Sequence, residues 1–186
     1  MQFGKPSKLP DGRYFLKMSQ EDGGRVIHQL NKVTIDIPAD TTQLSISVPS
    51  EQTLFFSDLD EKIVSQAKTS KVEWFGKEIS DDTVTAAYQK SINPESELSV
   101  SLVTVKGKVT TTAYDSQKNQ IDVSAISGTP VDVLLELIGL VFTKRTFEPV
   151  WKLLQARLVK VRRPPTATYM FKDEDDPESP DDEPDV

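Results

Sequence analysis

Apolar and polar residues alternate along much of the chain, and this pattern predicts a mainly β protein. Residues 33–37 and 44–48 alternate between apolar and polar side chains, and residues 98–105 continue the pattern. A period of two places every second side chain on one face, as in a half-buried strand. Pro38 and Pro49 end the first two runs, because proline cannot continue a central ladder. Shorter extended segments are predicted at 13–18, 26–30, 109–114 and 121–123.

The longest apolar segment, residues 131–142, is followed by a second apolar segment at 147–161. Periodicity alone leaves both segments open as strands or as buried helices. The β-branched residues and Gly139 favour a long strand for the first segment, and the second is interpreted as its antiparallel partner. The two would form a β-hairpin around the basic turn at residues 144–146.

Two helices are predicted between the groups of strands. Ser57 and Asp58 are suited to cap a helix over residues 59–67, whose apolar side chains recur at helical spacing. Ser80 precedes a second helix over residues 81–90, with acids in its first turn and lysine in its last. About eight strands with two inserted helices suggest an antiparallel barrel or sandwich with helices covering one end.

The composition argues against most catalytic and metal-binding chemistry. The 186 residues suit one domain, or one domain with appended segments. The chain has no cysteine and only one histidine, His28, so thiolate metal sites, a cysteine nucleophile and multi-histidine centres are excluded. The acidic clusters at residues 58–61 and 81–82 lie at predicted helix N-termini, where carboxylates interact favourably with the helix dipole. We therefore expect no enzyme activity, no cofactor and no metal.

The chain also lacks the apolar segments that membrane targeting requires. Its N-terminus, residues 1–6, has no apolar stretch typical of a signal peptide. No segment approaches the roughly 18 consecutive apolar residues of a membrane-spanning helix. We expect a soluble, intracellular protein, located in the host cytoplasm or nucleoid if it is viral.

Charge is distributed unevenly along the sequence, although the net charge is only −7. Residues 173–186 contain nine acids and no base, whereas residues 144–172 contain eight bases and one acid. An acidic segment with three prolines and one terminal valine cannot bury apolar area, so we expect it to be disordered. It is either a solubilising tail or an interaction tail that competes with a polyanion for the basic segment beside it.

Basic and aromatic residues alternate in the last quarter of the chain. Proteins that bind single-stranded nucleic acid need cations for the phosphates and flat side chains on which bases stack. On a regular strand, however, Lys152 and Arg157 point to opposite faces, so no uniformly basic face is expected. The candidate DNA-binding residues are Trp74, Lys77, Tyr114, Lys144, Arg145, Trp151, Lys152, Arg157, Lys160, Arg162 and Arg163.

Three parts of the sequence together resemble the OB-fold single-stranded DNA-binding proteins of bacteriophages and large DNA viruses. They are the W-F-G stretch at 71–80, the aliphatic segment 131–142 leading through a W-K-L-x-Q strand at 147–155, and the acidic C-terminus. The resemblance implies an OB-like antiparallel barrel at 13–163, preceded by an arm at 1–12 and followed by a linker at 164–172 and the tail.

In such phage proteins the tail lies over the DNA groove when no DNA is bound and recruits replication partners. The resemblance therefore implies that the tail here competes with DNA and binds replication proteins such as a polymerase or helicase. The residues implied in this role are Asp173, Glu174, Asp175, Asp176, Asp181, Asp182, Glu183 and Asp185.

The function expected from the sequence is to coat and protect single-stranded DNA during replication, recombination or repair. The alternative is a non-enzymatic protein-interaction module or a structural component of a virion. Salt dependence distinguishes the two, because binding to phosphates weakens steeply with salt and an apolar protein interface need not.

Overall fold

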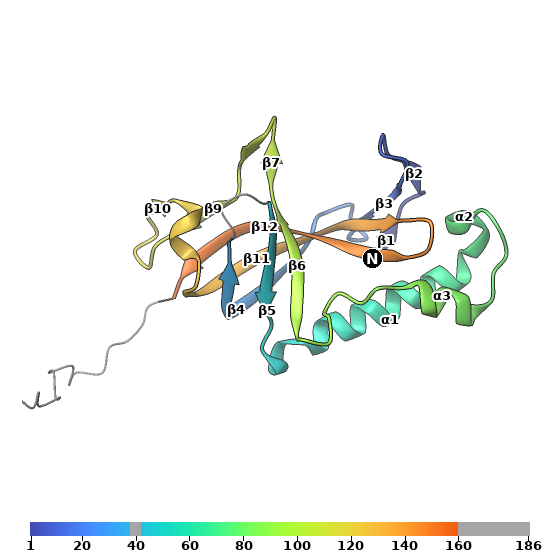
Figure 1. Ribbon diagram of the computed structural model, residues 1–186, viewed down its shortest axis with the longest axis horizontal. Helices are drawn as coiled ribbons and strands as arrows, with labels where there is room; N and C mark the ends of the chain where they lie inside the picture. The colour runs from blue at the N-terminus through green and yellow to red at the C-terminus, as the bar shows by residue number, and fades with distance from the viewer. Residues whose placement is uncertain (38–41, 160–186) are drawn as a thin grey trace, which may run out of the picture.

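The structure is a computed structural model that describes residues 1–37 and 42–159 (Figure 1). It is mainly β, as predicted, with helices inserted between strands. The strands are β1 (Gln2–Phe3), β2 (Ser7–Lys8), β3 (Tyr14–Ser19), β4 (Val26–Asp36), β5 (Gln43–Ser47), β6 (Glu97–Leu102), β7 (Thr104–Val105), β8 (Lys108–Val109), β9 (Thr112–Tyr114), β10 (Gln120–Ile121), β11 (Pro130–Phe142) and β12 (Phe147–Leu158). The helices are α1 (Leu54–Thr69), α2 (Lys71–Phe75) and α3 (Asp81–Ala87), with 3-10 turns at Ser50–Gln52 and Val123–Ile126.

Five strands close into a ring in the order β4-β5-β6-β12-β11, and β11 pairs back onto β4. Numbered along the chain, the ring has the order 1-2-3-5-4, a Greek-key arrangement of the kind found in five-stranded OB barrels. The predicted OB-like barrel is confirmed. One detail differs from the antiparallel prediction: β6 and β12 run parallel, because a closed ring with an odd number of strands cannot be antiparallel at every pair.

The β11–β12 hairpin is the longest element and forms as predicted (Figure 1). Its first half belongs to the ring, and its far end extends beyond the ring to pair with β3 through residues 139–142. The segment predicted as an N-terminal arm contributes β1 and β2, both paired with β3. Strands β9 and β10 form a second hairpin beside the other end of β12.

The helices lie along one side of the hairpin (Figure 1). The prediction that Ser57 and Asp58 cap the first helix is wrong, because α1 already begins at Leu54 and the 3-10 turn before it leads directly into it. Ser80 caps α3 as predicted and accepts a hydrogen bond from the Thr83 amide, but this helix ends at Ala87 rather than at Lys90. The W-F-G stretch between them begins with the short helix α2.

Asp60 corrects the interpretation of the first acidic cluster. It lies in the second turn of α1, is buried, and accepts hydrogen bonds from the Tyr88 hydroxyl and the Ser91 hydroxyl, both at 2.7 Å. The Ser91 amide donates to the same carboxyl group, and burial raises the pKa of Asp60. Its role is to join α1 to the segment that follows α3.

Several sequence predictions lie outside the described residues. They concern the acidic tail, the linker, and the cations Lys160, Arg162 and Arg163. In the described ranges, no group of histidine and acidic side chains is arranged to hold a metal ion. Of the helices described, none is both long and apolar enough to cross a membrane.

Candidate nucleic-acid interface

A β-bulge in β12 determines which side chains reach the outer surface of the barrel. Leu134 pairs with Gln155 whereas Leu135 pairs with Leu153, so Leu154 is an extra residue on β12. A bulge of this kind reverses the alternation of side chains beyond it. Trp151, Leu153 and Ala156 are accordingly buried, while Lys152 and Arg157 both lie on the outer side.

The bulge therefore overturns the expectation that Lys152 and Arg157 face opposite ways. The sequence parity assumed a regular strand between them, and one inserted residue makes the two positions equivalent. The outer face of β12 carries both cations and no acid between them. Lys152 and Arg157 therefore share the outer face of β12, and Glu148 lies on the same face nearer to the hairpin turn.

The strand register places Lys152 in a row that runs around the barrel. Its neighbours are Ser101 on β6 and Glu136 on β11, and Ser101 is paired in turn with Gln43 on β5. Polar side chains occupy the outer positions of β5 and β6, among them Gln43, Ser45, Ser99 and Ser101.

Both acids on the outer side of β11 are paired with arginine. Arg25 binds Glu136 through two hydrogen bonds of 2.7 and 2.6 Å, and this pairing holds the pKa of Glu136 below its usual range. Lys17 and Lys152 lower the same pKa further. Arg157 contacts Asp132 at 2.6 Å and remains half exposed.

A groove of about 320 Å³ lies between the N-terminal strands and the outer face of β5 and β6. Arg13 and Phe15 line one side of it and Ser99 and Ser101 the other, with Val150 of β12 also in its lining. Arg13 is held by Asp11, whose carboxylate lies 2.7 Å from the guanidinium. The partly buried ring of Phe15 and the open serines make this groove suited to a flat, polar-edged group.

A second depression, of about 290 Å³, lies at the other end of β12. Tyr114 of β9 lines it together with Arg157 and the amide side chains of Gln29 and Gln155. The Tyr114 ring is partly exposed. Amide side chains both donate and accept hydrogen bonds, so an aromatic ring beside them matches the edge and face of a nucleobase.

The largest of these three depressions, a cleft of about 480 Å³, brings together four residues predicted from the sequence. Trp74 and Lys77 come from α2 and the segment after it, and Lys144 and Arg145 from the turn of the β11–β12 hairpin. In that turn the Thr143 hydroxyl accepts hydrogen bonds from the Arg145 and Thr146 amides, which fixes its backbone. No ion pair of Lys77, Lys144 or Arg145 is found within the described ranges.

The two tryptophans are core residues. Trp151 is 2% exposed and packs edge-on against Phe56 of α1, with ring centroids 5.4 Å apart. Trp74 is 7% exposed and packs edge-on against Phe142. Neither ring has a face open to a base, so stacking by these two residues is not supported. Trp151 is buried because it occupies an inward-facing position on β12, whereas Trp74 is buried where α2 packs against the end of the β11–β12 hairpin.

The structure also adds two aromatic residues that the site prediction missed. Tyr14 is 46% exposed beside the largest cleft, and Phe15 lines the groove. Both lie on β3, whose pairing with the far end of β11 brings them to the hairpin. Their spacing of about 130 residues from the hairpin turn left no local signal in the sequence.

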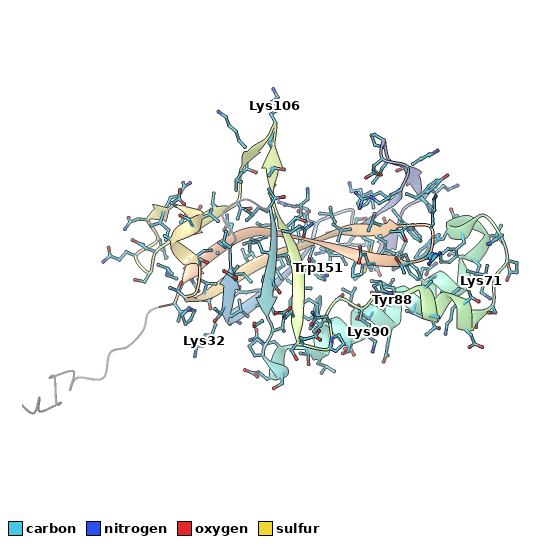
Figure 2. The ribbon with its side chains drawn as sticks, viewed as in Figure 1. Lys32, Lys71, Tyr88, Lys90, Lys106 and Trp151 are labelled. Carbon is cyan, nitrogen blue, oxygen red and sulfur yellow. The ribbon has the colours of Figure 1, made fainter. Side chains whose placement is uncertain are left out.

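Lysines differ in position between the two sides of the molecule (Figure 2). Lys106 stands at the tip of the projecting β7–β8 hairpin, away from the helical side where Lys71 and Lys90 lie. Lys71 is paired with Asp81 at 2.6 Å. Lys106 has no ion pair among the residues that the structure describes.

Comparison with known proteins gives one family and a set of distant structural similarities. Residues 31–173 match the sequence profile of DUF5871, described as a family of unknown function. No curated protein matches the sequence. The single-stranded DNA-binding protein from bacteriophage Enc34 is similar in structure, with a TM-score of 0.47 and 11% identity over 92% of this chain and 97% of that one.

Two further structures of the phage protein give comparable values. Its C-terminal truncation has a TM-score of 0.47 and 12% identity, over 88% of this chain and 98% of that one. Its complex with single-stranded DNA has a TM-score of 0.46 and 10% identity, over 86% of this chain and 97% of that one. Similarity at this level does not assign a function to the present chain.

Proposed function

The chain belongs to DUF5871, a family of unknown function, and we propose that it binds single-stranded DNA along the outer face of the β11–β12 hairpin. The observation that carries this proposal is the bulge at Leu154, which places Lys152 and Arg157 on the same outer face of an OB-like barrel. Barrels of this topology bind oligonucleotides on the outer face of their second and third strands and in the adjoining loops.

The expected path of the strand begins at the hairpin turn. Lys144 and Arg145 occupy the loop between the fourth and fifth barrel strands, one of the two loops that OB barrels use for oligonucleotides. From there the strand would pass Lys152 and end near Arg157, with phosphates following the cations. The serines of β5 and β6 would line the path on the other side.

Base contacts in this proposal come from side chains other than the tryptophans. Tyr114 and Phe15 are partly exposed and line the two depressions on either side of Lys152. An aromatic platform contributes about 1–3 kcal/mol per stacked base and tolerates any sequence, because every base has a π-face. We therefore expect binding with little sequence preference.

The proposal extends to the acidic tail and to the biological role. Tethering keeps the nine acids of residues 173–186 at high local concentration near the cations, so they would compete with DNA and be released for replication proteins when DNA binds. The role would be to protect single strands during replication, recombination or repair. The cations Lys160, Arg162 and Arg163 precede the tail in the sequence and would add to the phosphate contacts.

Fluorescence anisotropy with labelled oligo-dT tests the proposal. The full chain is titrated at several salt concentrations beside the variant Arg145→Gln/Lys152→Gln. Each lost phosphate contact lowers the salt slope by about 0.7 on single strands, so the double variant should lose about 1.4 and bind more weakly. The control Lys62→Gln/Lys90→Gln removes the same charge from the helical side and should leave the slope unchanged.

Two outcomes would contradict the proposal. Absence of binding by the full chain and by a truncation ending at Lys172, even at low salt, would exclude single-stranded DNA and favour a protein-interaction module. Equal losses in the test and control variants would mean that net charge, not the outer face of β12, governs binding. Tighter binding by the truncation than by the full chain would support competition by the tail.

A further inference from the structure

The β7–β8 hairpin projects from the barrel as a separate two-stranded sheet (Figure 1). Its turn consists of Lys106 and Gly107, with φ angles of 51° and 77°. Two successive residues in the left-handed region form the two-residue turn whose twist matches that of the flanking strands. The hairpin therefore has a defined shape.

The base of the hairpin is fixed to β12. The Thr111 hydroxyl accepts a hydrogen bond of 2.9 Å from the Val103 amide and donates one of 2.7 Å to the Leu153 carbonyl. Thr111 is buried, and the Thr110 amide donates to the Val103 carbonyl at 2.7 Å. Because an isolated two-stranded hairpin is marginally stable in water, these contacts hold it in place. Leu153 follows Lys152, so the base of the hairpin is attached to β12 directly beside this lysine.

The hairpin exposes one valine on each of its faces. Val105 pairs with Lys108, and Val109 pairs with Thr104. Adjacent side chains on a strand point to opposite faces, so Val105 and Val109 lie on opposite sides. They are 55% and 46% exposed. Exposed apolar side chains on both faces give a solvated hairpin no stabilisation. They would be buried on both sides if the hairpin were inserted between two apolar surfaces.

The position of the hairpin is between the two sites where the proposed path would place a base. Strand β6 pairs with β12 at residues 151–153, and β9 pairs with the same strand at residues 155–157. The hairpin connects β6 to β9, so it stands between the groove beside Ser99 and the depression beside Tyr114. These are the two places where the proposed path offers an aromatic ring to a base.

We infer that the β7–β8 hairpin is a blade that inserts between two neighbouring bases of the bound single strand. Val105 contacts one base and Val109 the other, and Lys106 and Lys108 neutralise the adjacent phosphates. Apolar side chains inserted between bases unstack them. The lysines at the tip favour a polyanion over a purely apolar partner. The inference rests on the proposed function and adds to it an unstacking device.

An adenine-rich single strand with an internal 2-aminopurine provides the test, because the fluorescence of this base rises when it is unstacked. The full chain should raise the fluorescence on binding. The variant Val105→Ala/Val109→Ala should lose at least half of that rise, bind about fivefold more weakly and keep its salt slope. Val72→Ala, which shortens an exposed valine on α2, is the control and should change neither binding nor fluorescence.

A second variant tests the lysines separately. Lys106→Gln/Lys108→Gln should lower the salt slope by about 1.4 and keep part of the fluorescence rise. Circular dichroism and thermal melting verify that each variant is folded.

The outcomes separate the two proposals. If the full chain does not bind the strand, the proposed function fails. If it binds, and the valine variant binds and unstacks the strand as well as the full chain does, the blade is excluded while the proposed function stands. A change in oligomeric state caused by the valine variant, without a change in DNA binding, would assign the hairpin to a protein contact instead.

Discussion

The two faces of β12 differ in what they do, although a single segment of 12 residues supplies both. The inner face carries Trp151 and Leu153 into a core shared with α1. The outer face carries Lys152 and Arg157 to the surface, where the latter is paired with Asp132. The bulge at Leu154 separates these roles, since without it one of the two cations would point into the core. We expect stability to depend on the inner face and DNA binding on the outer face.

The largest effect on stability should follow from removing the largest buried side chain on the inner face of β12. Trp151→Ala should lower the free energy of unfolding by about 3–5 kcal/mol, because the cavity left between β12 and α1 cannot collapse fully. Urea denaturation measures the loss. Trp151→Phe keeps a ring against Phe56 and should lose much less. Leu154→Ala, on the outer side of the same strand, is the control. A loss as large in this control would contradict the division between the faces.

Removing the hydrogen bonds of Asp60, which join α1 to the segment after α3, should have an intermediate effect on stability. Asp60→Ala leaves the Tyr88 hydroxyl and the Ser91 hydroxyl and amide buried without their acceptor, at a cost of about 1–3 kcal/mol. Urea denaturation again provides the measurement. Asp58→Ala, an exposed position on the same helix, should be close to neutral. Equal losses in the free energy of unfolding for the two variants would contradict a stabilising role for the hydrogen bonds of Asp60.

The smallest effect on stability should come from the Arg25–Glu136 ion pair on the outer face of the barrel. The pKa of Glu136 is lowered by Arg25, so its contribution to stability is present above the ordinary pKa of 4.5 and is lost as the pH falls through the lowered value. Between pH 6 and pH 3, the full chain should lose more stability than Glu136→Gln, by less than about 1 kcal/mol. Denaturation at the two pH values measures the difference. An equal loss would show that the pair contributes nothing.

Local sequence signals predicted the elements of this fold well. Alternation over 44–48 corresponds to β5, the run over 98–105 is divided between β6 and β7, and the two apolar segments around the basic turn form the β11–β12 hairpin. Ser80 caps its helix because the capping contact involves only residues three positions away. In the site, the sequence singled out Lys77, Lys144 and Arg145 by type, and they line one cleft.

The parts that could not be predicted depend on residues far apart in the chain. The parallel pairing of β6 with β12 and the arrival of Phe15 beside β11 join segments separated by about 50 and 130 residues. The burial of Trp151 depends on its packing against α1, and the periodicity of β12 gives no information about that contact. Asp60 was interpreted as a helix-terminal acid because its partners, Tyr88 and Ser91, lie outside its own helix.

The sequence by itself determined that this is a mainly β protein with a long basic hairpin, no cysteine chemistry and a strongly acidic end, because periodicity, composition and charge are local properties. Only the tertiary structure decided which cations share a surface and which aromatic rings are buried. One extra residue in β12 brings Lys152 and Arg157 to the same surface, and the register that creates it is set by pairing with β11 rather than by β12 alone.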